Sequence, residues 1–339
     1  MVAPVGPMGV LRDRLASKQG MAGYRATAAS RGQVLIPRDL HRVRGGLWTY
    51  ASCRRYVLAA NQITGWLAGR SVKLVPGVHR DWEPPFSPDD WADWQRRIGA
   101  SLGAVVEDAV VHLPADKRRR RFSLLLLDRT EAPIGHVKFA MAEIKPATLK
   151  ALAIFAQHPT SLMWVPSLVE SGSMGDWRFL LTTTMPQQAH RHAVLTPVRR
   201  RSIIAEIQER LAEVVGLPAN GTAAVHGDFG PWNVRELRDG TIAVVDWEDV
   251  GVGPIAADEL WHAVNIRIVS GDDPDRAAGK TSIELGMHKP EDVKAAARFW
   301  LASFEAPQPE DVEPGSVYPP WVSSLRSRLQ RAIEVLVAV

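Results

Sequence analysis

The stretch from Ala109 to Ala140 most constrains the fold of this chain, because it contains three successive strand-like runs. These runs are rich in β-branched and other apolar residues, and turn signals separate them. The middle run is continuously apolar enough to be a buried strand. The three predicted strands are Ala109–Leu113, Phe122–Leu127 and Gly135–Ala140.

A helix is expected to follow from Pro146, and a further strand at Trp177–Thr183, before the pattern becomes mainly helical. Thr196-Pro197 is a good helix start and Gly216 a good stop. Strands followed by helices predict an α+β fold with a small β-rich lobe and a larger helical lobe. A cleft between such lobes is a default ligand site. The later helices are predicted at Pro254–Val269, Pro290–Phe304 and Trp321–Val337.

The first hundred residues differ from the rest, because they are rich in Gly, Pro and Arg. Short helices are expected there at Val57–Leu67 and Pro88–Leu102, the second starting with a proline and acids in its first turn. We therefore predict three parts: an N-terminal extension of unknown role at residues 1–103, a small β-rich N-lobe at 104–186, and a helical C-lobe at 187–339.

Composition excludes several classes of protein. A net charge of +4 is too small to indicate nucleic-acid binding by itself. The single cysteine, Cys53, excludes an internal disulfide framework and a multi-cysteine zinc module. Met1 to Gly20 lacks the apolar centre of a secretory signal, and the apolar stretch Tyr56–Leu67 is too short and polar to span a bilayer. We expect a cytoplasmic protein without a membrane or nucleic-acid partner.

The segment from Ala224 to Asp249 carries the chemistry. Two short strand-like runs flank Asp239-Gly240, a strong signal for a two-residue hairpin turn. With that turn, Asn233 would lie directly opposite Asp246, and their Cβ atoms would be about 5 Å apart. The amide oxygen and the carboxylate could then share one hard cation such as magnesium, which also binds water and substrate phosphates. Asp228, on a nearby turn, suits the role of a base that accepts a proton from a hydroxyl.

The pattern His226-Gly227-Asp228, four residues, Asn233 and a later Asp246 resembles the signature of the aminoglycoside phosphotransferase and choline kinase family. The resemblance implies a bilobal protein-kinase-like fold, in which the N-lobe at 104–186 binds nucleotide and the C-lobe at 187–339 contains the catalytic loop and the substrate site. It also implies that Asp228 is the catalytic base, that Asn233 and Asp246 hold Mg2+ on ATP, and that His226 supports the catalytic loop.

The same resemblance places nucleotide binding on Lys138, in the third predicted strand, and on Met185, just after the strand at Trp177–Thr183. Two features depart from the family pattern. The basic run Pro114–Arg121 replaces the glycine-rich loop over the phosphates. The helix segment Thr148–Gln157 contains no acid to pair with the lysine, and Glu143 lies before it.

The leading hypothesis is therefore an ATP-dependent kinase that transfers the γ-phosphate to a hydroxyl of a small molecule. Aminoglycoside-, amino-alcohol- and sugar-like acceptors all stay open. A choline-like ligand would need aromatic faces such as Trp261 and Trp300, and an aminoglycoside would need acids such as Asp258 and Glu259. The alternative is a degenerate kinase fold that binds or scaffolds without turnover. A metal-dependent hydrolase is disfavoured, because no second histidine-rich cluster accompanies His226.

Overall fold

The computed structural model describes most of the chain from residue 84 onward and parts of the chain before it. The described residues are 22–27, 34–37, 40–43, 63–64, 66–68, 70–75, 77–82, 84–114, 119–185, 190–216, 220–306, 312, 317–318 and 320–338. Cys53, most of the predicted helix Val57–Leu67 and part of the basic run Pro114–Arg121 lie outside them.

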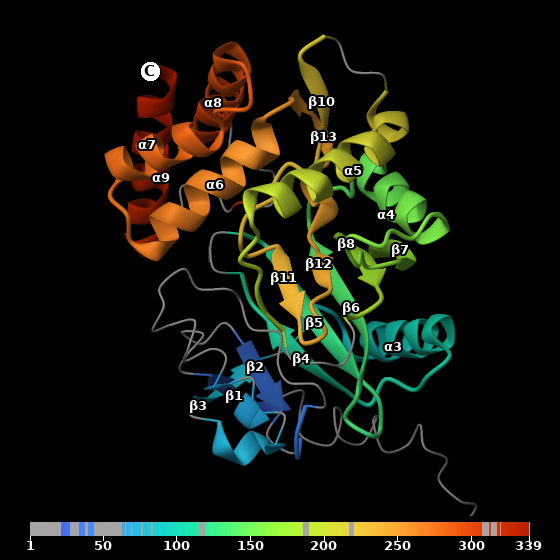
Figure 1. Cartoon of the computed structure of the whole chain (residues 1–339). Coiled ribbons are helices and arrows are strands. Elements are labelled where there is room, and N and C mark those ends of the chain that lie inside the picture. Colours follow the sequence, from blue (N-terminus) through green and yellow to red (C-terminus); the bar gives the residue numbers. More distant parts are fainter. Residues whose placement is uncertain are drawn as a thin grey trace, which may run out of the picture. The chain divides into compact units, whose positions relative to one another are not determined.

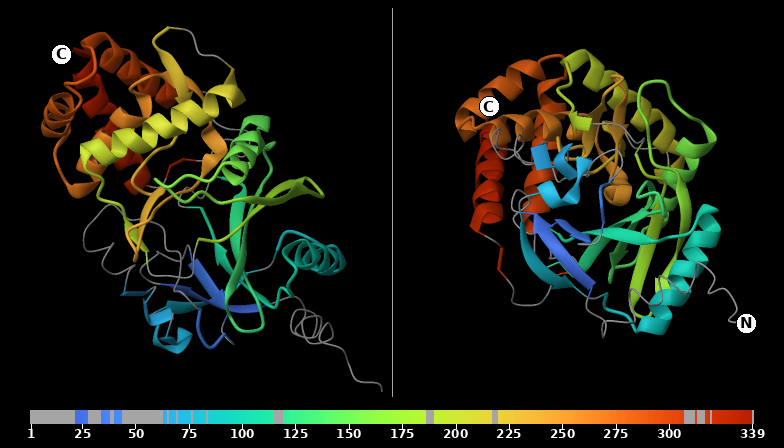
Figure 2. Two further views of the ribbon diagram at one scale, coloured as in Figure 1. Left: turned by 45° about the vertical axis from the view of Figure 1, so that its right-hand side comes forward. Right: turned by 90° about the horizontal axis from the view of Figure 1, so that it is seen from below.

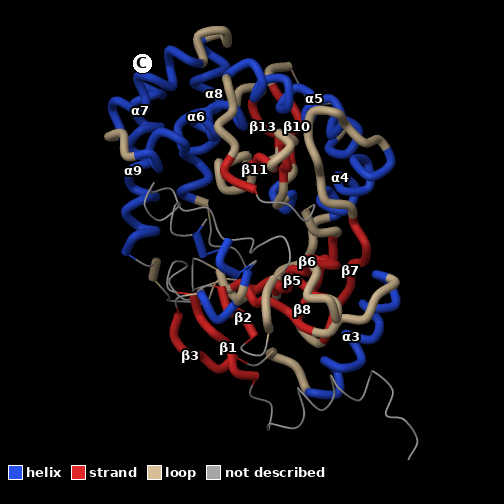
Figure 3. The backbone as a smooth tube through the Cα atoms, turned by 60° about the horizontal axis from the view of Figure 1, so that its bottom comes forward, coloured by secondary structure: helices blue, strands red, loops and turns tan. Residues whose placement is uncertain are grey.

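The chain divides into two compact units. The β-rich unit comprises residues 1–49, 60–143 and 169–188, and the helical unit comprises residues 50–59, 144–168 and 189–339. Figure 3 shows the two kinds of structure, with the large sheet in red and the many helices in blue. The boundary predicted at residue 103 falls inside the β-rich unit.

One eight-stranded sheet forms the β-rich unit within the described residues. Its strand order is β3-β1-β2-β4-β5-β6-β8-β7, so strands from the first hundred residues extend the sheet that the later strands build (Figure 1). The sequence did not predict these early strands. The strands are β1 (Ala22–Thr27), β2 (Val34–Pro37), β3 (Gly77–Trp82), β4 (Asp108–His112), β5 (Arg121–Leu127), β6 (Pro133–Ala140), β7 (Leu168–Met174) and β8 (Trp177–Thr182).

The central strand β5 is buried on both faces, as its apolar run predicts. Phe122, Leu124 and Leu126 pack in one cluster with the helix α3 (Pro88–Leu102). Leu125 and Leu127 pack on the other side with residues from the first hundred, among them those of β2 and of the short 3-10 helix η1 (Val72–Leu74). Successive side chains of a strand point to opposite faces, so one run of leucines fills both cores.

The helical unit contains six helices and two small sheets within the described residues. Strands β10 and β13 pair with each other, and β12, β11 and β9 form the second sheet. Figure 2 shows α5 as the long yellow-green helix beside α4. The elements are α4 (Pro146–Gln157), β9 (His190–His192), α5 (Pro197–Val215), β10 (Thr222–Val225), β11 (Val234–Leu237), β12 (Ile242–Val244), the 3-10 helix η2 (Trp247–Asp249), β13 (Gly251–Pro254), α6 (Ala257–Ser270), α7 (Pro274–Glu284), α8 (Pro290–Glu305) and α9 (Pro320–Ala338).

Most predicted helices are present, with ends shifted by up to about three residues. The helix starts follow local hydrogen bonds: Ser87 Oγ accepts from the Asp90 amide at 3.2 Å and Thr196 Oγ1 accepts from the Arg199 amide at 3.3 Å. Helix α7 was not predicted, because only three small residues of it are buried and give no apolar stripe. No helix in the described part of the chain is long and apolar enough to cross a bilayer.

Candidate active site

The loop between β10 and β11, residues 226–233, forms the centre of the candidate site. Its second residue is Gly227, whose φ of 84° lies in the left-handed region. A Cβ at this position would lie 2.6 Å from the carbonyl carbon of Asp249 and closer still to its oxygen. The backbone of η2 therefore passes so close to the loop that only glycine fits.

Asp258, in the first turn of α6, fastens the start of the loop. Its carboxylate accepts hydrogen bonds from the backbone N–H groups of His226 at 2.7 Å and Gly227 at 3.2 Å. Burial raises the pKa of Asp258 to about 6, although these two hydrogen bonds oppose the increase. From the sequence, Asp258 was one of the acids that an aminoglycoside would need; in the structure its carboxylate binds the backbone of the loop instead.

His226 has the contacts of the structural support that the resemblance implied. Its ring is fully buried and lies 4.6 Å from the ring of Trp247. The Asp228 amide donates to Nδ1 at 3.3 Å, so Nδ1 is the acceptor and the Nε2–H group donates to the Val245 carbonyl at 3.1 Å. The imidazole thereby joins the loop of residues 226–233 to the residue that follows β12.

The Asp228 side chain accepts three hydrogen bonds, all from neutral donors. Trp261 Nε1 donates to Oδ1 at 2.9 Å. Trp232 Nε1 and Asn233 Nδ2 both donate to Oδ2, each at 2.9 Å. Two of these donors belong to the loop itself, and the third comes from α6. The carboxylate is consequently held by both the loop and α6. None of these contacts was predicted from the sequence.

The electrostatic surroundings of Asp228 favour its protonated form. Burial raises the pKa of Asp228 to about 7, while the indole N–H groups of Trp232 and Trp261 act in the opposite direction. The negative charges of Asp246 and Asp249 raise it further. A carboxyl group whose pKa lies near neutrality is well matched to general base catalysis.

The hairpin after the loop differs from the prediction by one residue. Val234 pairs with Val244 and Arg235 with Ala243, so Asn233 lies beside Val245 and not opposite Asp246. The turn has three loop residues, since Leu237 N–H donates to Thr241 O at 2.8 Å and Gly240 N–H donates to Leu237 O at 3.0 Å. Gly240, with a φ of 86°, supplies the left-handed residue of this longer turn. The predicted two-residue turn is therefore wrong.

The two predicted magnesium ligands, Asn233 and Asp246, still lie at neighbouring positions of the hairpin despite the shifted register. Val245 N–H donates to the Asn233 carbonyl at 3.0 Å, and the next residue, Asp246, adopts a left-handed backbone with φ 69°. The Asn233 amide nitrogen donates to Asp228, which leaves its amide oxygen as the group that could bind a cation. An amide oxygen and a carboxylate are the hard donors that Mg2+ requires, so these residues fit the ion.

The two residues expected to bind nucleotide, Lys138 and Met185, belong to the β-rich unit. Lys138 is half-buried in β6, where it pairs with Ser123 of β5 and Leu180 of β8, and Met185 is buried just after β8. Their binding roles stay predictions. Glu143, the acid nearest to Lys138 in the sequence, forms an ion pair with Arg178 at 2.7 Å.

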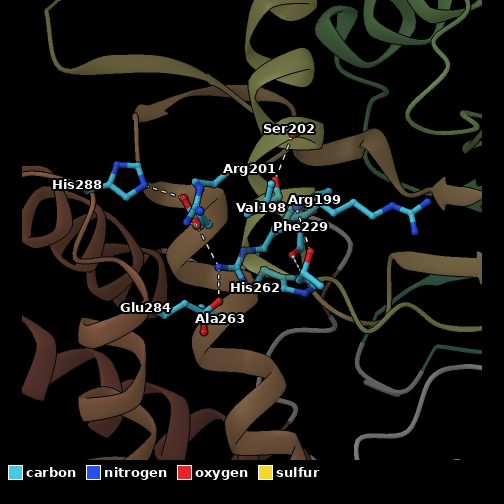
Figure 4. Close-up of polar contacts among 12 residues, drawn as sticks. Val198, Arg199, Arg201, Ser202, Phe229, His262, Ala263, Glu284 and His288 are labelled. Carbon is cyan, nitrogen blue, oxygen red and sulfur yellow. Dashed lines mark hydrogen bonds and ion pairs between the residues drawn. The ribbon is translucent and has the colours of Figure 1, made fainter.

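A buried ion-pair network links α6 to α5 and α7 (Figure 4). Arg200 of α5 binds Glu259 at 3.0 Å and also pairs with Glu284 of α7, and His288 contacts Glu259 at 2.7 Å. Burial would raise the pKa of Glu259, but hydrogen bonds from His288 and Arg200 hold it below its ordinary value. The Glu259 carboxylate is thus fully engaged by partners inside the protein. His262, from the same helix, contacts the carbonyl of Phe229 in the loop at 3.2 Å.

Residues 173–298 match the model of the phosphotransferase enzyme family. The matched residues make up less than half of the chain and include the loop of residues 226–233. The match agrees with the family resemblance, and the sheets and helices of the two units have the predicted α+β class. No curated protein matches the sequence significantly.

Solved structures of low identity are also similar to this chain. They include an amicoumacin kinase in complex with AMP-PNP, Ca2+ and Ami (10% identity, TM-score 0.40, 74% of this chain and 96% of that chain). A thermostable mutant of the aminoglycoside phosphotransferase APH(4)-Ia, in complex with ADP and hygromycin B, has 9% identity and a TM-score of 0.42 over 72% of this chain and 97% of that chain. A choline/ethanolamine kinase family protein from Mesorhizobium loti has 11% identity and a TM-score of 0.30, and the match covers 64% of this chain and 90% of that chain.

Proposed function

We propose, from the phosphotransferase family match of residues 173–298 and from the surroundings of Asp228, that this chain is an ATP-dependent phosphotransferase. It transfers the γ-phosphate of ATP to a hydroxyl group of a small molecule. One observation carries the proposal: a carboxylate held by three neutral donors lies in the same loop as Asn233, one of the two residues that fit a magnesium ion.

Each site residue then has a defined task. Asp228 orients the acceptor hydroxyl and takes its proton while the acceptor oxygen bonds to the γ-phosphorus and ADP leaves. Asn233 and Asp246 hold Mg2+, which neutralises phosphate charge when bound. Lys138 offsets charge on the nucleotide, and Met185 contributes to nucleotide binding. Positioning and electrostatics supply most of the rate increase in reactions of this kind.

The acceptor is an aminoglycoside-, amino-alcohol- or sugar-like molecule. Two acids that could have recognised the amines of an aminoglycoside, Asp258 and Glu259, are both engaged by protein partners. An amine-rich acceptor would therefore need other acidic residues. The engagement of these two acids favours acceptors that are recognised through their hydroxyl groups and apolar faces.

An ATP-consumption screen over hydroxylated metabolites, amino alcohols and antibiotics tests this function. Wild-type protein should consume ATP with one acceptor class, and Asp228→Asn should reduce that rate by about 10²-fold or more. Asp239→Asn is the matched control, since Asp239 lies exposed on the hairpin turn and should keep the wild-type rate. Equal rates for wild type and Asp228→Asn would refute the assignment.

A binding or scaffold protein without turnover is the second candidate, and α4 gives a specific reason to consider it. The helix carries no acid, and Lys145 at its start pairs with Asp249 of η2 at 3.1 Å. A kinase helix would present an acid to the nucleotide-binding lysine, and α4 has no acid to present. Thermal unfolding with and without Mg-ATP separates the candidates, because ligand binding raises the melting temperature. No shift would favour the scaffold.

A further inference from the structure

The hydrogen bonds to Asp228 are distributed unequally between its two carboxylate oxygens. Oδ2 accepts from both Trp232 and Asn233, whereas Oδ1 accepts only from Trp261 among the described residues. Each carboxylate oxygen has two lone pairs that can accept hydrogen bonds. The lone pairs of Oδ2 are thus both used, and one lone pair of Oδ1 remains.

Trp261 is itself held firmly in place. Its ring stacks on Trp300 with a centroid distance of 4.1 Å and an interplanar angle of 16°. The Trp300 indole N–H donates to the carbonyl of Ala257, in the same helix as Trp261, at 2.8 Å. Both tryptophans are buried in the core of the helical unit. The donor to Oδ1 therefore comes from the packed core.

The donors to Oδ2 have a different origin. Trp232 and Asn233 both belong to the catalytic loop, and the indole of Trp232 lies against Gly230 so closely that a Cβ there would be within 2.6 Å of its ring. These donors move with the loop that carries Asp228. Trp261 is the one side-chain donor that ties the carboxylate to a separate, rigid element among the described residues.

We propose, building on the phosphotransfer assigned to Asp228 above, that Trp261 is the positioning residue for the base. Its indole N–H fixes the rotation of the carboxylate, so that the remaining lone pair of Oδ1 accepts the hydroxyl proton of the acceptor. That proton passes to Oδ1 as the acceptor oxygen bonds to the γ-phosphorus, the bond from phosphorus to ADP breaks, and the proton later leaves to solvent. An indole carries no formal charge, so it orients the oxygen without forming an ion pair with it.

Three Trp→Phe variants test the proposal by steady-state ATP consumption. Trp261→Phe should lower kcat by about ten- to a hundredfold, with the KM for ATP changed by less than about twofold. Trp232→Phe should lower kcat less, because Asn233 still donates to Oδ2. Trp94→Phe is the matched control: its indole N–H is buried without a partner among the described residues, and kcat should stay at the wild-type value.

A double-mutant cycle distinguishes positioning from a structural defect. In the Asp228→Asn background Trp261→Phe should have no further effect on kcat, because the group that it positions is gone. The same fold loss in both backgrounds would overturn the proposal. If Asp228→Asn abolishes turnover but Trp261→Phe has the wild-type kcat, the positioning role of Trp261 is refuted. The proposed function of Asp228 then remains intact.

The hydrogen bond can also be measured without turnover. In an indole ¹⁵N–¹H spectrum the Trp261 signal, assigned by its loss in Trp261→Phe, should be slow to exchange with solvent. It should shift and exchange at least about tenfold faster in Asp228→Ala, while the Trp94 signal stays unchanged. A Trp261 signal that is the same in wild type and Asp228→Ala would overturn the proposal even if no acceptor is found.

Discussion

Gly227 and Gly240 form a matched pair that tests how closely η2 packs against the loop of residues 226–233. Their φ angles are nearly equal, at 84° and 86°. An added Cβ at Gly240 meets nothing within 4 Å, whereas one at Gly227 would lie 2.6 Å from the carbonyl carbon of Asp249. Alanine at either position therefore has the same backbone strain, and only Gly227→Ala adds a collision with backbone.

The expected magnitudes follow from this geometry. The left-handed conformation costs alanine about 1–2 kcal/mol, so Gly240→Ala should lower the free energy of unfolding by about that amount. At Gly227 the carbonyl carbon of Asp249 would have to retreat by at least about 0.8 Å to reach van der Waals separation, and its oxygen by more. Such overpacking adds about 1–3 kcal/mol or more. Gly227→Ala should therefore be less stable than Gly240→Ala by about that margin.

Urea denaturation followed by tryptophan fluorescence measures both variants against wild type. Gly227→Ala should also lose ATP consumption, because Asp228 is the next residue, and Gly240→Ala should retain it. If the two variants have equal free energies of unfolding, the close approach of the Asp249 carbonyl to Gly227 is refuted. Gly103→Ala, with a φ of 63° and open space around it, provides a second control in the β-rich unit.

Four further changes have defined outcomes. Arg200→Ala should lower the free energy of unfolding by about 3–5 kcal/mol, because it leaves Glu259 buried with a weaker partner. Burial lowers the pKa of His262 from 6.5 to about 3, so wild type should lose stability below pH 6.5, by about 2 kcal/mol at pH 5, and His262→Gln should lose less. Asp246→Asn should abolish the Mg-ATP shift in melting temperature. Lys138→Met should raise the KM for ATP by about tenfold or more, with kcat less affected.

Each of these predictions has a control or a contradicting result. Arg201→Ala should cost less than about 1 kcal/mol, since Arg201 is partly exposed and lies 3.6 Å from Glu259. An equal decline with acid for wild type and His262→Gln would contradict the histidine assignment. An undiminished Mg-ATP shift in Asp246→Asn would remove that residue from the metal site, and an unchanged KM in Lys138→Met would remove the lysine from the nucleotide site.

The sequence determined the features that depend on neighbouring residues. Helix α5 begins where Thr196 and Pro197 predict it, because the capping hydrogen bond spans three residues. Strand β5 was predicted as a buried strand from its apolar run alone, and the structure buries it on both faces. The spacing of His226, Asp228 and Asn233 was sufficient to predict that their side chains lie close together, since all three belong to the loop between β10 and β11.

Tertiary structure alone decided the features that join distant segments. The hairpin register depended on which turn Gly240 would complete, and a one-residue difference moved Asp246 away from its expected partner. Trp261 is 33 residues from the Asp228 that it contacts, and strands β1–β3 join a sheet whose other members lie far along the chain. Local hydrogen bonds are encoded by adjacent side chains, but these contacts exist only once the helices and sheets have packed.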